Sequence, residues 1–281
     1  MAQVSPSSPN KEFPNKATLC NNDLSTIEEG KITPSEAASP FITTSPINAH
    51  KIIAELVGTY IIIFIGCGSI LIERIHPFTM MGIGEPVAWG LAVMVMIYSF
   101  GHVSGAHFNP AITIAFAVTY KFPWPQVIGY VGSQLAGSTL AVLTLKVMFH
   151  SKTLDISVTT TQFVGEATTL EAFIWEFILS FILMLTICGV ATDNRAVTEL
   201  SGVVVGATMI FNMIIAGNIT GASMNPARSL GPAFVSRKLC YVWLYITAPI
   251  LGMVVASAIY SVLWLPKSPN LDKEEDSSKN V

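Results

Sequence analysis

The tripeptide Asn-Pro-Ala occurs twice in this chain, at 109–111 and at 225–227. Each copy opens an apolar stretch of about ten residues, half of the ~20 residues that a helix needs to cross a bilayer. The preceding residues match as well, because 101–111 aligns without gaps on 217–227 at a constant offset of 116. The chain therefore contains an internal repeat, which constrains its architecture before any single residue is interpreted.

The composition indicates a membrane protein. Charged residues make up 12% of the 281-residue chain, hydrophobic residues make up 51%, and the mean hydropathy is +0.57. A soluble domain of this size needs more polar surface than these residues supply. The net charge of −3 gives no basic face for a nucleic-acid partner. The four cysteines lie far apart, and we expect no disulfide, no metal site and no cofactor.

Six apolar runs are long enough to span a membrane, and polar segments flank them. We expect a disordered N-terminal tail at 1–45, a membrane domain at 46–265 and a short C-terminal tail at 266–281. The predicted spans are 51–73, 82–101, 125–148, 171–191, 200–216 and 241–265.

The two halves of the membrane domain are related, and their orientations are opposite. The sequence around Glu55 resembles that around Glu176, and 130–137 resembles 245–252. Each half holds three spans and one half-span, so the second half begins on the other side of the membrane. A half-span must bury its non-helical backbone in protein or along a water-filled cavity. Two half-spans that enter from opposite faces are expected to meet near the midplane.

The two Asn-Pro-Ala tripeptides, called boxes from here on, consist of residue types that are typical of helix starts. Asparagine suits an N-cap, and proline suits the first helical position, where its missing N–H costs nothing. Two helix N-termini then bring partial positive charge to one central region, which repels cations, while the asparagine amides can donate to the oxygen of a neutral solute. A helix start without further function is the alternative for a single box, and the repeat disfavours it. The residues are Asn109, Pro110, Ala111, Asn225, Pro226 and Ala227.

The boxes, the two glutamates and the flanking signatures at 104–111 and 221–229 resemble the aquaporin/glycerol-facilitator superfamily, and within it the plant nodulin-26-like intrinsic proteins. This resemblance covers about residues 50 to 265. It implies an all-α fold with six transmembrane helices and two re-entrant half-helices in an inverted repeat. It also implies a passive channel that forms homotetramers in the lipid bilayer and excludes protons and ions. We do not expect an enzyme, because no nucleophile, base and orienting group recur at catalytic spacing. The expected solutes are water, glycerol and neutral metalloid hydroxides such as arsenous or boric acid.

The family resemblance also places a four-residue selectivity filter at fixed distances from the boxes: Trp89, Met213, Ala222 and Arg228. Arg228 is a candidate pore residue even without the family resemblance, because a charge inside a membrane half-helix is costly unless it faces water. The alternative is an arginine that snorkels to the surface. Trp89 could instead belong to an interfacial aromatic belt. Met213 departs from the small aliphatic residue usual in the subgroup, and its flexible thioether either narrows the opening or swings aside.

The intramembrane carboxylates of Glu55 and Glu176 have two interpretations. They could relay protons, which would make the chain a proton-coupled secondary transporter of a small solute. Alternatively, they accept hydrogen bonds from the backbone N–H groups that lead to each box, and the repeat favours this scaffolding role. His107 is expected to pack behind its loop as a third scaffolding residue and not to bind metal. A closed pore in a structural or adhesive membrane protein is a further alternative.

The polar tail after the last span holds a candidate phosphorylation site. Ser268 follows Lys267 just past the last span, and family resemblance makes it a candidate site for a protein kinase, with an unmodified tail serine as the alternative. We expect a multi-pass protein of the plasma membrane with both termini in the cytoplasm.

The orientation of the chain in the membrane is not determined by the positive-inside rule. On the family's topology, the positive charges at the outer ends are Arg74, Lys146, Lys152, Arg237 and Lys238, and those at the cytoplasmic ends are Lys51, Lys121, Arg195 and Lys267.

Overall fold

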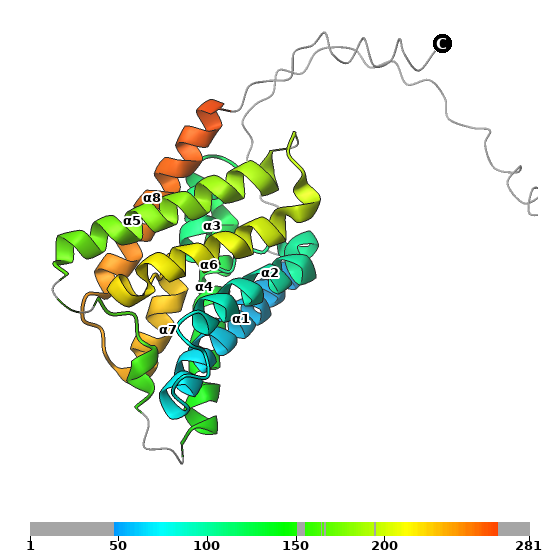
Figure 1. Cartoon of the computed structure of the whole chain (residues 1–281). Coiled ribbons are helices and arrows are strands. Elements are labelled where there is room, and N and C mark those ends of the chain that lie inside the picture. The colour runs from blue at the N-terminus through cyan, green and yellow to red at the C-terminus, as the bar shows by residue number, and fades with distance from the viewer. Residues whose placement is uncertain (1–47, 151–154, 164, 166, 194, 264–281) are drawn as a thin grey trace, which may run out of the picture. The chain divides into compact units, whose positions relative to one another are not determined.

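The computed structural model describes residues 48–150, 155–163, 165, 167–193 and 195–263, and these ranges contain helices and no strand (Figure 1). Six helices are long and apolar enough to cross a membrane, and two shorter ones begin at the boxes. The spans are α1 (Ala49–Ile75), α2 (Gly84–Ser104), α4 (Trp124–Met148), α5 (Thr169–Ile187) with the π turn η2 (Cys188–Thr192), α6 (Ser201–Thr220) after the short η3 (Thr198–Leu200), and α8 (Val242–Leu263). The half-helices are α3 (Pro110–Val118) and α7 (Pro226–Ser236), and a 3-10 turn, η1 (Ile156–Thr159), precedes α5. The predicted fold class is confirmed, whereas the predicted tails and Ser268 lie outside the described residues.

The two halves pack their helices in matching pairs. Helix α1 lies against α4 and α5 lies against α8, while α2 and α6 bring the halves together. A Cβ on Gly137 would lie 2.3 Å from the carbonyl oxygen of Leu56, and a Cβ on Gly252 would lie 2.3 Å from that of Phe177. Small residues at these crossings let the backbones approach closely, as is common between membrane helices. The repeat seen in the sequence is therefore also a repeat of helix packing.

Helices α2 and α6 continue past the predicted ends at 101 and 216 and stop at equivalent glycines. Gly105 and Gly221 follow Ser104 and Thr220 with φ of 91° and 82° and end the helices in the left-handed region. The apolar runs end about one turn before the helices do, because the last turn of each helix carries polar residues such as Ser104 and Thr220. The Ser104 and Thr220 hydroxyls are instead bonded inside the protein, each to a buried glutamate.

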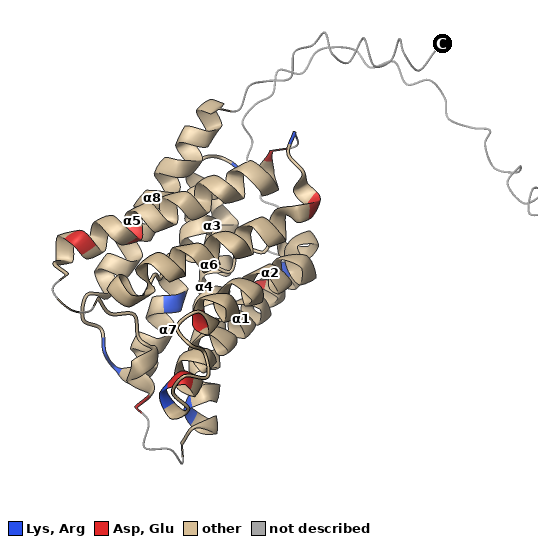
Figure 2. Ribbon diagram, viewed as in Figure 1, with Lys and Arg blue, Asp and Glu red and all other residues tan. Residues whose placement is uncertain are grey.

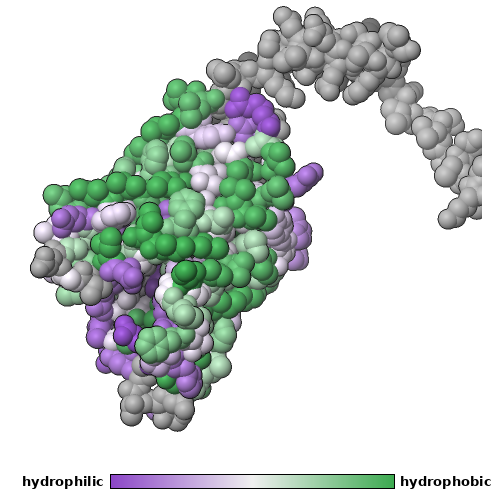
Figure 3. Space-filling view, in the orientation of Figure 1, coloured by the Kyte–Doolittle hydropathy of each residue, from purple (hydrophilic) through white to green (hydrophobic). Residues whose placement is uncertain are grey.

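The surface of the helices suits a bilayer. In Figure 2 most of the ribbon is tan, the colour of residues other than Lys, Arg, Asp and Glu, and Figure 3 shows hydrophobic residues over much of the spanning helices. Large apolar side chains such as Ile128 on α4 and Val262 on α8 are each 82% exposed. Because lipid contact covers such residues, their exposure agrees with six membrane-spanning helices.

Candidate functional site

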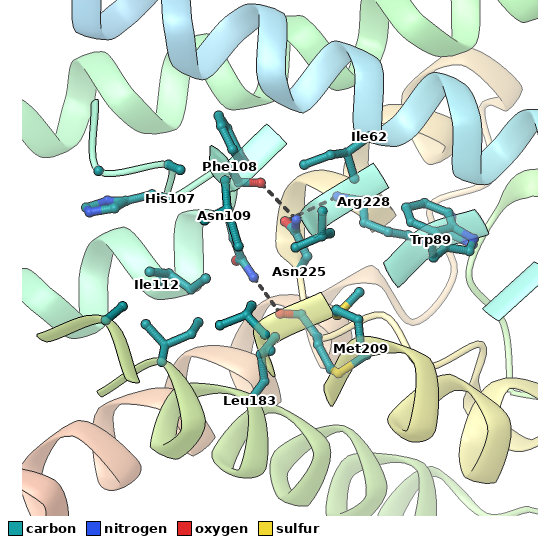
Figure 4. A pocket seen from close by; sticks show the side chains of 18 of the residues that line it. Ile62, Trp89, His107, Phe108, Asn109, Ile112, Leu183, Met209, Asn225 and Arg228 are labelled. Carbon is teal, nitrogen blue, oxygen red and sulfur yellow. Dashed lines mark hydrogen bonds between the residues drawn. The ribbon is translucent and has the colours of Figure 1, made fainter. Parts of the chain in front are cut away.

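A cavity of about 90 Å³ lies where the half-helices α3 and α7 begin (Figure 4). One part of its wall is apolar and includes Val93, Leu183 and Val205, from α2, α5 and α6. The other part holds the two box asparagines, Asn109 and Asn225. The lining residues lie far apart in the sequence, and the fold brings them around one narrow space.

Both box asparagines cap their half-helices. The Asn109 side-chain oxygen accepts the Ala111 N–H at 2.9 Å, and the Asn225 oxygen accepts the Ala227 N–H at 2.9 Å. In each case proline occupies the first helical position, where no N–H is needed. The two half-helices therefore start at the cavity and direct the positive ends of their dipoles toward it.

Each asparagine amide also donates a hydrogen bond to the loop of the other half of the protein, which the sequence did not indicate. The Nδ2 of Asn109 donates to the carbonyl oxygen of Met224 at 2.8 Å, and the Nδ2 of Asn225 donates to that of Phe108 at 2.9 Å (Figure 4). Each amide nitrogen carries two N–H groups, so the cross-bond leaves one for an oxygen atom in the cavity. The pair of bonds fixes the two boxes relative to each other.

The loops that approach the boxes hold matching strained backbones. Phe108 and Met224, the residues before the asparagines, have φ of 48° and 52°, and Ala106 and Ala222 have φ of 52° and 39°. Such angles are rare for residues other than glycine and persist only where neighbouring groups hold them. Surrounding hydrogen bonds must therefore stabilise both loops.

Glu55 binds the first of these loops. Its carboxylate accepts the backbone N–H groups of His107 at 2.9 Å and Phe108 at 2.7 Å, and the Ser104 hydroxyl at 2.7 Å. The Gln134 amide donates a fourth bond at 2.8 Å. Glu55 is 0% exposed and does not line the cavity. A fully buried carboxylate needs such partners, and here it receives four donors.

Glu176 binds the second loop in the same way with one donor fewer. It accepts the N–H groups of Ser223 and Met224, each at 2.9 Å, and the Thr220 hydroxyl at 2.7 Å. The repeat position of Gln134 is Pro249, which has no amide to donate. Glu176 is also fully buried and does not line the cavity.

Arg228 and Trp89 meet at one end of the cavity (Figure 4). The Arg228 guanidinium carbon lies 4.8 Å from the centre of the Trp89 ring, and its Nη1 donates to the carbonyl oxygen of Thr159 at 2.7 Å. The ring also lies against Gly66, where a Cβ would approach it to 2.1 Å. Arg228 is thus held inside the protein and does not snorkel to the surface. Sequence reasoning missed Thr159 and Gly66 because neither belongs to a recognisable motif.

The other two predicted filter residues lie outside this cavity wall. Met213 and Ala222 are buried, at 7% and 2% exposed, and neither lines the cavity. Met209, one turn earlier on α6, does line it. The structure therefore brings Trp89 and Arg228 together, and it adds Met209, which no sequence motif marks, as a lining residue.

His107 belongs to the loop before the first box, lies among aromatic rings and is one of the residues that line the cavity. Its ring is 4.9 Å from that of Phe122 and 5.2 Å from that of Tyr130, and its Nδ1 is 3.1 Å from the Thr113 hydroxyl. Among the described residues, no three histidine, cysteine or carboxylate side chains come together in a way that could hold a metal.

Comparisons with known proteins agree with a membrane fold of six spans and two half-helices. The sequence model of the family "Major intrinsic protein" matches residues 43–260. The chain belongs to the major intrinsic protein family. It is 47% identical to the putative aquaporin NIP4-1 of Arabidopsis thaliana over 88% of this chain and 87% of that protein. It is 45% identical to nodulin-26 of Glycine max over 82% and 83% of the two chains. The X-ray structure of the aquaglyceroporin from Plasmodium falciparum has a TM-score of 0.69 at 28% identity and covers 75% of this chain and 95% of that one.

Membership of the major intrinsic protein family confirms the resemblance drawn from the boxes. It makes the chain an integral, multi-pass membrane protein of a channel family. The proton-coupled transporter is not supported, because the channel relatives argue against it and neither buried glutamate lines the cavity.

Proposed function

We propose that this chain is a passive channel for small uncharged solutes, with the cavity between the two boxes as part of its pore. The observation that carries the proposal is the pair of reciprocal bonds between Asn109 and Met224 and between Asn225 and Phe108. These bonds hold two helix starts at one cavity, where each amide keeps an N–H for a passing oxygen. A neutral solute with oxygen atoms meets both hydrogen-bond donors and apolar side chains in the wall of this cavity.

Ion exclusion follows from the same arrangement. The N-termini of α3 and α7 carry partial positive charge at the cavity, and Arg228 adds a full positive charge at one end. A cation or a hydrated proton would lose hydration in a narrow, partly apolar space while facing these positive charges. A neutral molecule meets no such barrier. We therefore assign ion exclusion to Arg228 together with the half-helix N-termini.

The solutes we propose are water, glycerol and neutral metalloid hydroxides such as arsenous or boric acid. Trp89 supports passage of polyols, since its ring supplies an apolar surface beside the donors of Arg228. We assign the filter to Trp89, Met213, Ala222 and Arg228, and the scaffolding of the loops to Glu55, Glu176 and His107. No step of this function needs a cofactor.

We further propose a homotetramer in the plasma membrane, with both termini in the cytoplasm and one pore in each subunit. Phosphorylation of Ser268 by a protein kinase remains a proposal from the sequence, because this residue lies outside the described ranges. Comparing Ser268→Ala and Ser268→Asp with the parent for permeability and trafficking tests it, and identical behaviour of all three would refute it.

A pair of tryptophan substitutions tests the channel itself. Ile112 lines the cavity, and Ile112→Trp should fill it, whereas Ile128 is 82% exposed on α4 and Ile128→Trp should leave it open. Stopped-flow light scattering on reconstituted vesicles would give the water, glycerol and boric acid fluxes. We expect the parent and Ile128→Trp to conduct without a proton gradient, and Ile112→Trp to approach empty vesicles. Equal flux in both variants, or flux that requires a proton gradient, would refute the proposal.

A further inference from the structure

A second cavity, of about 460 Å³, opens at the ends of α1, α4 and α7. It shares no lining residue with the cavity between the boxes. The charged and titratable side chains that line it, among the described residues, are those of Lys146, His150, Asp155 and Arg237, and its apolar wall includes Phe149 and Val235. The cavity therefore combines a basic rim with an apolar wall.

Asp155 supplies the carboxylate among the described residues that line this cavity, and this carboxylate already has partners. Asp155 accepts the backbone N–H of Ser157 at 2.9 Å and also the Ser157 hydroxyl, and the Lys238 amine lies 3.7 Å from it. These hydrogen bonds, with Lys238 nearby, hold the pKa of Asp155 below its usual value. Within the described part of the chain, neither Lys146 nor Arg237 takes part in an ion pair. Their positive charges are left for an anion from outside the protein.

The position of the cavity indicates where that anion comes from. Helices α1 and α4 span the membrane, and the cavity lies where α4 and the half-helix α7 end. The ends of membrane-spanning helices lie at the depth of lipid head groups. The basic residues gathered here also belong to the group at the outer ends that the positive-inside rule leaves unexplained.

We propose that this cavity binds a phosphate group and that the head group of an anionic phospholipid supplies it. Arg237 offers a planar fork of donors that suits a phosphate, and Lys146 adds a compact positive charge. Phe149 and Val235 offer apolar contact to the glycerol and first acyl carbons of the same lipid. Basic pockets between transmembrane helices on the cytoplasmic or matrix side bind anionic head groups, and this cavity has a similar composition at the opposite ends of the helices.

Thermal unfolding of the full chain in an uncharged detergent tests the proposal. The probes are dioleoyl phosphatidylglycerol, dioleoyl phosphatidylcholine and inorganic phosphate, each titrated against the parent, Lys146→Gln/Arg237→Gln and Arg74→Gln. Arg74 is the matched control, since it is an exposed basic residue in the last turn of α1 that does not line the cavity. The charge-preserving variant Lys146→Arg/Arg237→Lys checks that any loss comes from charge.

We expect phosphatidylglycerol to raise the Tm of the parent and of Arg74→Gln more than phosphatidylcholine does. In Lys146→Gln/Arg237→Gln the concentration needed for half of that rise should increase about tenfold or more, because two charge-assisted contacts are lost. The charge-preserving variant should recover most of the affinity. Equal effects of the two lipids, or an equal loss in Arg74→Gln, would refute the site. Equal protection by inorganic phosphate would refute the lipid as its source.

Discussion

Gly90 on α2 and Gly206 on α6 each lie against the other's backbone. A Cβ on Gly90 would be 2.5 Å from the carbonyl oxygen of Gly206, and a Cβ on Gly206 would be 2.7 Å from that of Gly90. The two positions are 116 residues apart, which is also the spacing of the Asn-Pro-Ala boxes. The halves of the protein therefore touch at repeat-equivalent glycines, and side chains larger than hydrogen would force them apart.

The first prediction is that Gly206→Ala destabilises the contact between the halves. The new methyl group would overlap a backbone oxygen, which cannot move as a flexible side chain can, and such overpacking typically costs ~1–3 kcal/mol. Gly132→Ala is the matched control, because Gly132 lies within α4 and a Cβ there meets nothing within 4 Å. Thermal unfolding in detergent should give a lower Tm for Gly206→Ala and an unchanged or slightly higher one for Gly132→Ala. Equal Tm values would mean that α2 and α6 can separate without cost.

The second prediction concerns the charge of Arg228. Arg228→Val should admit ions, because it removes the positive charge at the end of the cavity together with the bond to Thr159 and the contact with Trp89. Arg228→Lys keeps the charge and loses the planar stacking, so it should stay closer to the parent in ion exclusion. Proton and sodium leak into vesicles is the measurement. Vesicles with Arg228→Val that are as tight as the parent would place the ion barrier elsewhere.

The third prediction is a pH dependence of stability at Asp193. The hydrogen bond from the Arg195 side chain lowers the pKa of this carboxyl, and the Tyr260 hydroxyl donates a further bond at 2.8 Å. A carboxyl with a lowered folded pKa stabilises the fold above its unfolded pKa of about 3.9, and this stabilisation is lost as pH falls toward the folded value. Asp193→Asn should therefore lower the Tm at pH 7, and the difference from the parent should shrink below about pH 4.

Tyr260→Phe is the matched control for Asp193. It removes the hydroxyl bond and keeps the ring, so it should lower the Tm less than Asp193→Asn does. If the Tm difference between Asp193→Asn and the parent stayed constant from pH 7 to pH 3, the carboxylate charge would have no part in stability.

The helices could be predicted from local sequence patterns, whereas hydrogen bonds between residues far apart in the sequence could not. The spans and half-helices followed from apolar runs and from the Asn-Pro pairs, because these signals lie within one helix. The bond from Asn109 to Met224 joins residues 115 positions apart, and the bond from Arg228 to Thr159 joins residues 69 apart. No local pattern specifies such pairs. Thr159 also belongs to a turn that carries no motif, so its role at the filter became visible only in three dimensions.

The last prediction is that Met213, and not Met209, sets the limiting width. Met209 lines the open cavity, so shortening it enlarges a space that already exists. Met213 lies one turn further along α6, is buried and lies outside the cavity wall, and family resemblance places it in the filter with Trp89 and Arg228. Met213→Val should therefore raise glycerol flux more than water flux, because the larger solute is the more obstructed. Met209→Val is the control and should change the glycerol-to-water ratio less. Stopped-flow rates normalised to protein content measure both ratios, and a larger change in Met209→Val would place the constriction one helical turn deeper.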